Sequence, residues 1–149
     1  MLGKLVGFIA IATICQVSFA AEKVIFQCDT VPNGSIKVTA DNTIFKVNVN
    51  KQGKSIFNFS KDYKKNTSKN FIKFNYSYGS EDVAIGLLMG YFGKEKNSLH
   101  SIISDKNITF RDSYDIDNVV IVKCINNENY INRFKQLDKE KKLPGFSYD

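Results

Sequence analysis

Histidine and arginine are scarce in this chain of 149 residues. His100 is the only histidine, and the two arginines, Arg111 and Arg133, leave 19 lysines among the 21 basic residues. The sequence also lacks a Cys-x-x-Cys pair and any recognised serine or cysteine nucleophile motif. We therefore expect a non-enzymatic protein without a cofactor or a metal, and we interpret His100 as a structural or surface imidazole.

Neither a calcium site nor a nucleic-acid-binding surface is expected, because the residues that such sites require are missing. Asp112, Asp115 and Asp117 fall in the segment DSYDIDN, which lacks the glycine and the terminal glutamate of a calcium loop and is interpreted as a turn. Arginine interleaved with aromatic residues, which is typical of nucleic-acid binding, is also missing. No nucleic-acid partner is expected.

Apolar runs long enough to span a membrane are missing as well. The apolar run at residues 5–14 is shorter than the roughly 20 residues that a span needs. Lys4 precedes this run, and the small residues Ser18 and Ala20 follow it, which is the layout of a secretory signal peptide. We predict that residues 1–20 are this signal and that cleavage follows Ala20.

The predicted mature chain, residues 21–149, contains two cysteines, Cys28 and Cys124. They lie in the first and the last strand-like segments, VIFQCD and NVVIVKCI. An even number of cysteines in an exported protein indicates a disulfide. We expect Cys28 and Cys124 to join the two ends of the domain.

The predicted signal peptide and disulfide place the protein outside the cytoplasm. Glycosylation sequons at Asn58 and Asn75 lie in the middle of strand-like segments, which argues that they are chance matches in an asparagine-rich chain. We expect the periplasm of a Gram-negative bacterium, or otherwise an extracellular location.

Alternation of apolar and polar residues dominates the mature chain. In TIFKVNVN the apolar residues Phe45, Val47 and Val49 share one face, and KQGK, with Gly53 at a left-handed position, then turns the chain into SIFNFS. No repeat or linker interrupts residues 21–149. We predict one mainly β domain, a small antiparallel meander barrel or sandwich of seven to eight strands.

Two segments carry helix signals instead. SEDVAIGLLMGYFGKEK begins with a possible N-cap, Ser80, and ends at Gly93, which predicts a short apolar helix after the fifth strand. NNENYINRFKQLDKEKKLPG predicts an amphipathic C-terminal helix. Its apolar stripe consists of Tyr130, Ile131, Phe134 and Leu137.

The apolar stretch Val83–Phe92 is the first candidate site, because it is apolar on every side. It either fills the core or meets a partner. We expect a mixture, with Leu87 and Leu88 inside and Tyr91 and Phe92 at the rim. The predicted partner-binding residues are Leu87, Leu88, Met89, Tyr91 and Phe92.

The lysine-rich segment KDYKKNTSK is the second candidate site. It contains Lys61, Lys64, Lys65 and Lys69. A solvated loop is the simpler interpretation. The functional alternative is a contact with an anionic lipid or glycan, which the net charge of +6 permits.

The segment Phe26-Gln27-Cys28-Asp29, the stretch DNTIFKVNV and Cys124 resemble the periplasmic inhibitors of c-type lysozyme. Members of that family open with an aromatic-x-Cys strand, close with a second cysteine and fold as small antiparallel barrels. Their serine-rich inhibitory loop has no counterpart here, and a basic inhibitor would repel a basic lysozyme. The resemblance assigns no functional residue.

These observations lead to two functional hypotheses. The first is an exported binding protein of the cell envelope that inhibits or neutralises another protein, such as a wall-degrading enzyme or a toxin. The alternative is a small periplasmic envelope protein that contacts an anionic lipid or glycan through its lysine clusters.

Overall fold

Antiparallel strands that follow one another along the chain build the fold. The first four strands are β1 (Lys23–Thr30), β2 (Gly34–Ala40), β3 (Ile44–Lys51) and β4 (Lys54–Asp62). After the 3-10 turn η1 (Tyr63–Lys65) come β5 (Asn70–Tyr78), β6 (Val83–Phe92), β7 (Asn97–Ser104), β8 (Thr109–Asp112) and β9 (Val122–Ile125). The short strand β10 (Ile131–Asn132) and the helix α1 (Phe134–Lys139) complete the described elements.

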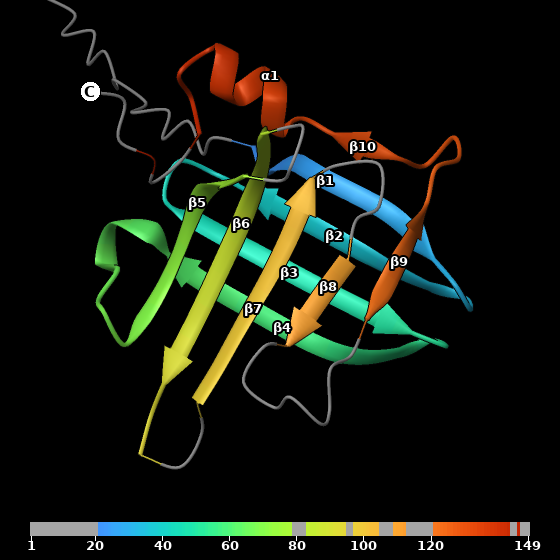
Figure 1. Ribbon diagram of the computed structural model, residues 1–149, viewed down its shortest axis with the longest axis horizontal. Helices are drawn as coiled ribbons and strands as arrows, with labels where there is room; N and C mark the ends of the chain where they lie inside the picture. Colours follow the sequence, from blue (N-terminus) through green and yellow to red (C-terminus); the bar gives the residue numbers. More distant parts are fainter. Residues whose placement is uncertain are drawn as a thin grey trace, which may run out of the picture.

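The computed structural model describes residues 21–78, 83–94, 97–104, 109–112, 121–143 and 146. In this part of the chain the strand order is β4-β3-β2-β1-β9-β8-β7-β6-β5, and β10 pairs with β1. The sheet therefore curls so that β5–β8 cross over β1–β4, with α1 at one end (Figure 1). The predicted antiparallel, mainly β class is confirmed.

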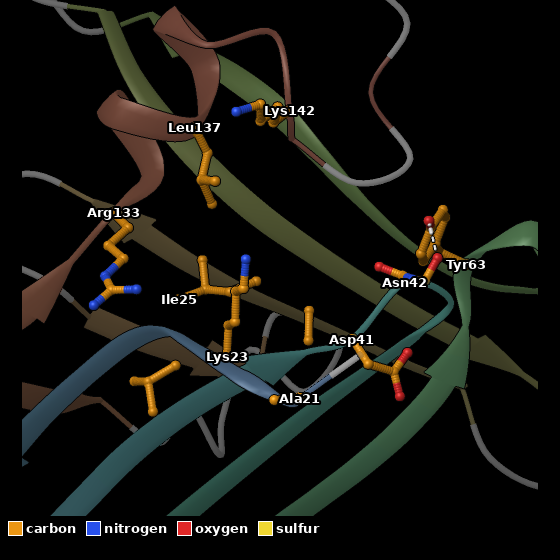
Figure 2. A pocket seen from close by; sticks show the side chains of 11 residues that line it. Ala21, Lys23, Ile25, Asp41, Asn42, Tyr63, Arg133, Leu137 and Lys142 are labelled. Atoms are coloured by element: carbon orange, nitrogen blue, oxygen red, sulfur yellow. Dashed lines mark hydrogen bonds between the residues drawn. The ribbon is translucent and has the colours of Figure 1, made fainter. Parts of the chain in front are cut away.

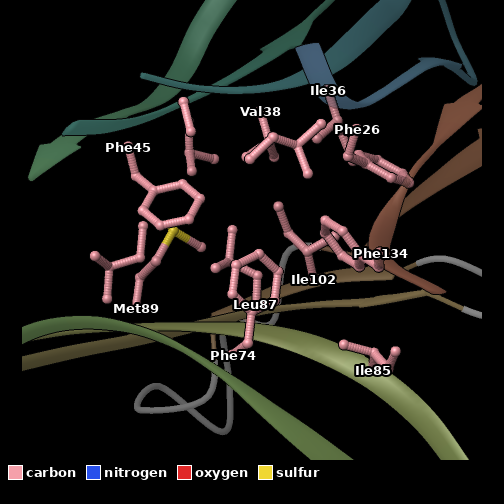
Figure 3. Close-up of a cluster of buried hydrophobic side chains, with 14 of the residues drawn as sticks. Phe26, Ile36, Val38, Phe45, Phe74, Ile85, Leu87, Met89, Ile102 and Phe134 are labelled. Atoms are coloured by element: carbon pink, nitrogen blue, oxygen red, sulfur yellow. The ribbon is translucent and has the colours of Figure 1, made fainter. Parts of the chain in front are cut away.

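The core lies between the two layers of the curled sheet. Side chains of β1–β3 point toward those of β5–β7 (Figure 3). Phe134 of α1 joins the layers, because its ring centroid lies 5.6 Å from that of Phe26 and 5.1 Å from that of Phe74. The largest fully buried side chains are Phe26, Phe45, Phe134, Ile36, Ile72, Leu87, Met89, Ile102, Val38, Val47, Val49 and Val122.

The predicted hairpin is confirmed. β3 and β4 pair from Ile44 with Asp62 to Lys51 with Lys54. Gly53 at the turn has a φ of +74° and Gln52 has a φ of +51°, so both central residues adopt the left-handed conformation of a two-residue hairpin turn.

The predicted disulfide is confirmed as well. Cys28 and Cys124 are bonded, with their Cα atoms 5.5 Å apart and a sequence separation of 96 residues. β1 and β9 are neighbours, and Thr30 pairs with Cys124. The bond therefore joins the first strand of the chain to a late one, at the middle of the strand order.

The predicted apolar helix is wrong: residues 83–92 form strand β6, between β5 and β7. Ile85, Leu87 and Met89 point into the core. The positions between them include Gly86 and Gly90, which weaken a helix by about 1 kcal/mol each. The possible cap Ser80 lies outside the described residues. A run that is apolar on every side thus fits a strand whose outer face carries glycines and the half-buried Leu88.

The predicted number of strands and the predicted C-terminal helix also need correction. The seven to eight expected strands become ten in the described part of the chain, because β2, β6 and β10 were not predicted as strands. The C-terminal helix is shorter than predicted. Ile131 belongs to β10, and α1 spans only Phe134–Lys139.

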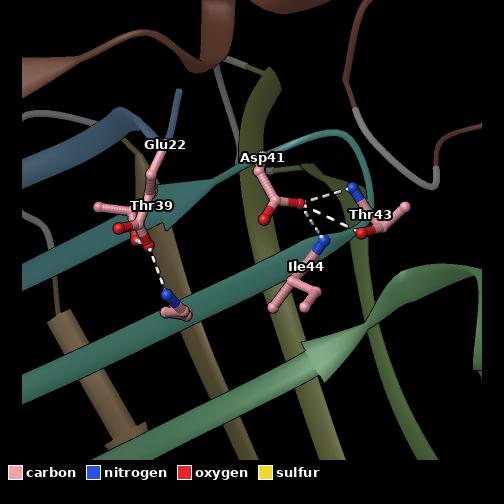
Figure 4. A network of polar contacts seen from close by, with 6 residues as sticks. Glu22, Thr39, Asp41, Thr43 and Ile44 are labelled. Atoms are coloured by element: carbon pink, nitrogen blue, oxygen red, sulfur yellow. Dashed lines mark hydrogen bonds and ion pairs between the residues drawn. The ribbon is translucent and has the colours of Figure 1, made fainter. Parts of the chain in front are cut away.

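A carboxylate holds the turn between β2 and β3 (Figure 4). One oxygen of Asp41 accepts hydrogen bonds of 2.7 Å from the backbone N–H groups of Thr43 and Ile44. The hydrogen bond from Ile44, followed by that from Thr43, holds the pKa of the Asp41 carboxyl below its ordinary value.

This lowered pKa predicts an acid-dependent contribution to stability. Below about pH 4 the unfolded chain takes up a proton at this position before the folded chain does. The contribution is therefore fully present above the ordinary pKa and is lost as the pH falls through the lowered one. We expect Asp41→Asn, which keeps an acceptor oxygen, to make the free energy of unfolding less dependent on pH in this window. Urea unfolding at a series of acidic pH values measures this dependence for both proteins. Parallel curves of unfolding free energy against pH for the wild type and the variant would contradict the prediction.

Candidate functional site

Aromatic and apolar side chains gather where β5 begins and β6 ends. We call Phe71, Leu88, Tyr91 and Phe92 the aromatic edge. In the antiparallel pair Phe71 lies opposite Gly90. The rings of Phe71 and Phe92 stack with their centroids 6.2 Å apart. A Cβ atom on Gly90 would lie 2.5 Å from the Phe71 ring, so glycine is what allows this ring to cover the backbone of β6.

The five predicted partner-binding residues divide between the core and the surface. Leu87 and Met89 are fully buried and belong to the core. Tyr91 is 48% exposed. Leu88 and Phe92 are half-buried. Leu88 was expected inside, but it lies opposite Lys73 on the outer face, because neighbouring residues of a strand point to opposite faces.

The second candidate site lies beside the first. We call residues 61–69 the lysine loop. The backbone N–H of Phe92 donates to the carbonyl of Lys69 over 2.6 Å. The Asn66 side chain donates to the carbonyl of Ile72 over 2.6 Å and accepts from its N–H over 3.0 Å. These bonds attach the loop to both β5 and β6, although the two sites were predicted separately.

One lysine ammonium group contacts the aromatic edge, and the neighbouring lysine loop carries others. Nζ of Lys73 lies 5.4 Å from the centroid of the Phe71 ring, a cation–π contact. Lys64 and Lys69 are exposed. Within the described residues, only Lys65 of the lysine loop has a carboxylate partner, Asp62 at 3.5 Å. The described charges in and beside this edge are therefore mainly positive.

The predicted lysine site is only partly an exposed surface. Lys61 belongs to β4 and is half-buried, so it is less accessible than the other three predicted lysines. Lys73 was not predicted as a contact residue. Its signal is present in FIKF, because residues two apart in a strand share a face, which places Lys73 beside Phe71.

The other sequence predictions concern residues away from this edge. His100 is 8% exposed, and its ring centroid lies 4.2 Å from that of Phe57. Asp115 and Asp117 lie outside the described residues, as does the side chain of Asp112. Among the residues that the structure describes, no three histidine, cysteine, aspartate or glutamate side chains are arranged to hold a metal ion.

Comparison with known proteins finds no relative: no family model, no curated protein and no solved structure matches this chain. In the part of the chain that the structure describes, no helix has both the length and the apolar character to cross a membrane.

Proposed function

We propose that this chain is an exported, non-enzymatic binding protein of the cell envelope that docks on an acidic face of another protein and inhibits or neutralises it. The observation that carries this proposal is the aromatic edge, where the stacked rings of Phe71 and Phe92 lie beside Lys73. Tyr91, which is 48% exposed, adds a further aromatic side chain at the same end of β6. Aromatic anchors surrounded by charged residues are typical of protein interfaces. The Cys28–Cys124 disulfide supports export, because such bonds persist in oxidising compartments.

The hydrogen bonds that order this surface favour a protein partner. The lysine loop is attached to β5 and β6 by the bonds of Asn66 and Lys69, so the surface is ordered before binding. Ordering in advance reduces the entropy that association costs. The lysines steer the approach of an acidic partner, and the aromatic rings supply the apolar contact.

We expect the double variant Tyr91→Ala, Phe92→Ala to weaken binding by about 2 kcal/mol or more, which is roughly 30-fold. Capture from envelope extract on the immobilised protein identifies the partner, and calorimetry with the purified partner measures the affinity. The matched control is Val31→Ala, Ile56→Ala, which truncates two other exposed apolar residues, 62% and 42% exposed. If the Tyr91/Phe92 variant folds normally and retains full affinity, the aromatic edge is not the binding surface.

The lysines support a second candidate, an anionic lipid or glycan surface. A contact made mainly by exposed lysines weakens strongly between low and high salt, whereas an apolar interface does not. Sedimentation with anionic phospholipid vesicles at two salt concentrations separates the candidates. One result would replace the protein interface by a lipid surface: the wild type binds vesicles, the double variant Lys69→Gln, Lys73→Gln does not, and no protein partner is captured.

A further inference from the structure

A pocket lies between α1, the start of β1 and the turn from β2 to β3 (Figure 2). Its volume is about 620 Å³, within the range of about 300–1,000 Å³ that is usual for small-molecule sites. The aromatic edge contributes no residue to its lining. The pocket is therefore a separate candidate site.

The inner wall of the pocket is apolar. Ile25 of β1 and Ala40 of β2 are 3% and 6% exposed. Leu137 of α1 is half-buried and points from the helix toward Ile25 (Figure 2). Ile25 and Ala40 thus form a closed apolar floor, and Leu137 keeps accessible apolar surface that an apolar ligand would remove from water.

The rim of the pocket is cationic. Lys23, Arg133 and Lys142 line it and are exposed. Lys142 pairs with Glu140 at 3.0 Å. Within the described residues no carboxylate lies within ion-pair distance of Lys23 or Arg133. The pKa of Glu140, the partner of Lys142, is lowered chiefly by the Gln136 hydrogen bond and to a smaller degree by the charge of Lys23, so the Arg133 charge is the less compensated of the two.

The one acidic residue among the lining residues is already engaged. Asp41 accepts three hydrogen bonds within its own turn, two from backbone N–H groups and one from the Thr43 hydroxyl. Its side chain points away from Leu137 and Ile25 (Figure 2). The carboxylate therefore offsets the rim charge only in part.

Hydrogen bonds between distant segments fix the walls. The backbone N–H of Arg133 donates to the carbonyl of Ile25 over 3.0 Å, which joins α1 to β1. The N–H of Tyr63, another lining residue, donates to the carbonyl of Thr43 over 3.1 Å. The pocket is thus formed by the fold itself, and a ligand would not need to order it.

We propose that this pocket binds a monomeric anionic amphiphile: an alkyl chain lies against Ile25, Ala40 and Leu137, and its carboxylate meets Lys23 and Arg133. Guanidinium and ammonium groups bind carboxylates through charge-assisted hydrogen bonds, and both Lys23 and Arg133 line this pocket. The apolar wall excludes small hydrophilic anions as the preferred ligand, and the cationic rim excludes cationic amphiphiles.

Calorimetric titration of the purified protein with decanoate, below its micelle concentration, tests the proposal. We expect saturable binding with one site per chain, and no binding of acetate or decyltrimethylammonium. Across octanoate, decanoate and dodecanoate, each added methylene pair should tighten binding, by up to about fourfold per CH₂. Anionic phospholipid vesicles serve as a further arm. Binding to vesicles without binding to monomeric decanoate would assign the cationic residues to a membrane surface and overturn the proposal.

Two double variants with equal loss of charge locate the site. Lys23→Gln, Arg133→Gln should weaken decanoate binding at least tenfold. Lys37→Gln, Lys123→Gln removes two exposed lysines that do not line the pocket, and should leave the affinity unchanged. All four positions are exposed, so both variants are expected to fold, which circular dichroism checks.

Three results would overturn the proposal. These are no binding of decanoate, equal affinity in the two double variants, or equal binding of decanoate and decyltrimethylammonium. The Tyr91→Ala, Phe92→Ala variant should bind decanoate as the wild type does, so failure of the proposed protein interface and failure of this pocket can be told apart.

Discussion

Loss of the Cys28–Cys124 disulfide is expected to lower the free energy of unfolding by about 4–5 kcal/mol, because the bond closes a loop with a sequence separation of 96 residues. Without the bond the unfolded chain gains the entropy of this long loop, while β1 and β9 still pair in the folded state. Total stabilities of small domains are about 5–15 kcal/mol, so the loss is a large part of the whole.

Reduction is the cleanest form of this experiment. Urea unfolding of the oxidised and the reduced wild-type protein compares two states with the same side-chain volume. The double variant Cys28→Ala, Cys124→Ala should unfold at a still lower urea concentration, because Cys28 is fully buried and its truncation also leaves a small cavity. Equal unfolding midpoints for the oxidised and reduced proteins would show that the bond does not stabilise the fold.

Alternation predicted the strands best where one face of the strand is buried and the other is solvated. Phe45, Val47 and Val49 are fully buried, and Lys46 between them is exposed. Such alternation of apolar and polar residues indicates a strand with one buried and one solvated face. The β3–β4 turn was equally readable, since Gly53 marks the left-handed position.

Alternation failed where both faces of a strand carry apolar residues. In β6 the inner face fills the core, while the outer face carries glycines and the half-buried Leu88. No row of polar residues is left to mark period two. Helix-start and helix-stop residues then dominated the prediction, although neighbouring strands decide the structure.

The candidate sites show a similar division. Tyr91 at the rim followed from local composition. The pairing of the lysine loop with Phe92 did not, because it depends on how the chain returns after β5. The rim of the pocket could not be read from any one stretch of sequence. Lys23 and Arg133 lie in distant segments, which are joined by the pairing of β10 with β1 and by the bond between the Arg133 amide and Ile25.

Adjacent leucines in β6 should respond in opposite ways to the same charge. Leu87 is fully buried, so Leu87→Asp places a carboxylate in the core without a partner and should cost more than about 4 kcal/mol of the free energy of unfolding. Leu88 is half-buried on the outer face opposite Lys73. Leu88→Asp gains an opposite charge across the strand pair and should cost about 1 kcal/mol or less.

Urea unfolding followed by circular dichroism measures both variants, and Leu87→Ala separates the cost of the cavity, about 2–5 kcal/mol, from that of the buried charge. Binding gives an independent measurement. Leu88→Asp adds a negative charge to the aromatic edge, so the folded variant should lose affinity for an acidic partner through like-charge repulsion. Similar stability of the Leu87→Asp and Leu88→Asp proteins would contradict the placement of β6. Undiminished partner binding by Leu88→Asp would instead exclude the outer face of β6 from the interface, because that face carries Leu88 beside Phe71 and Phe92.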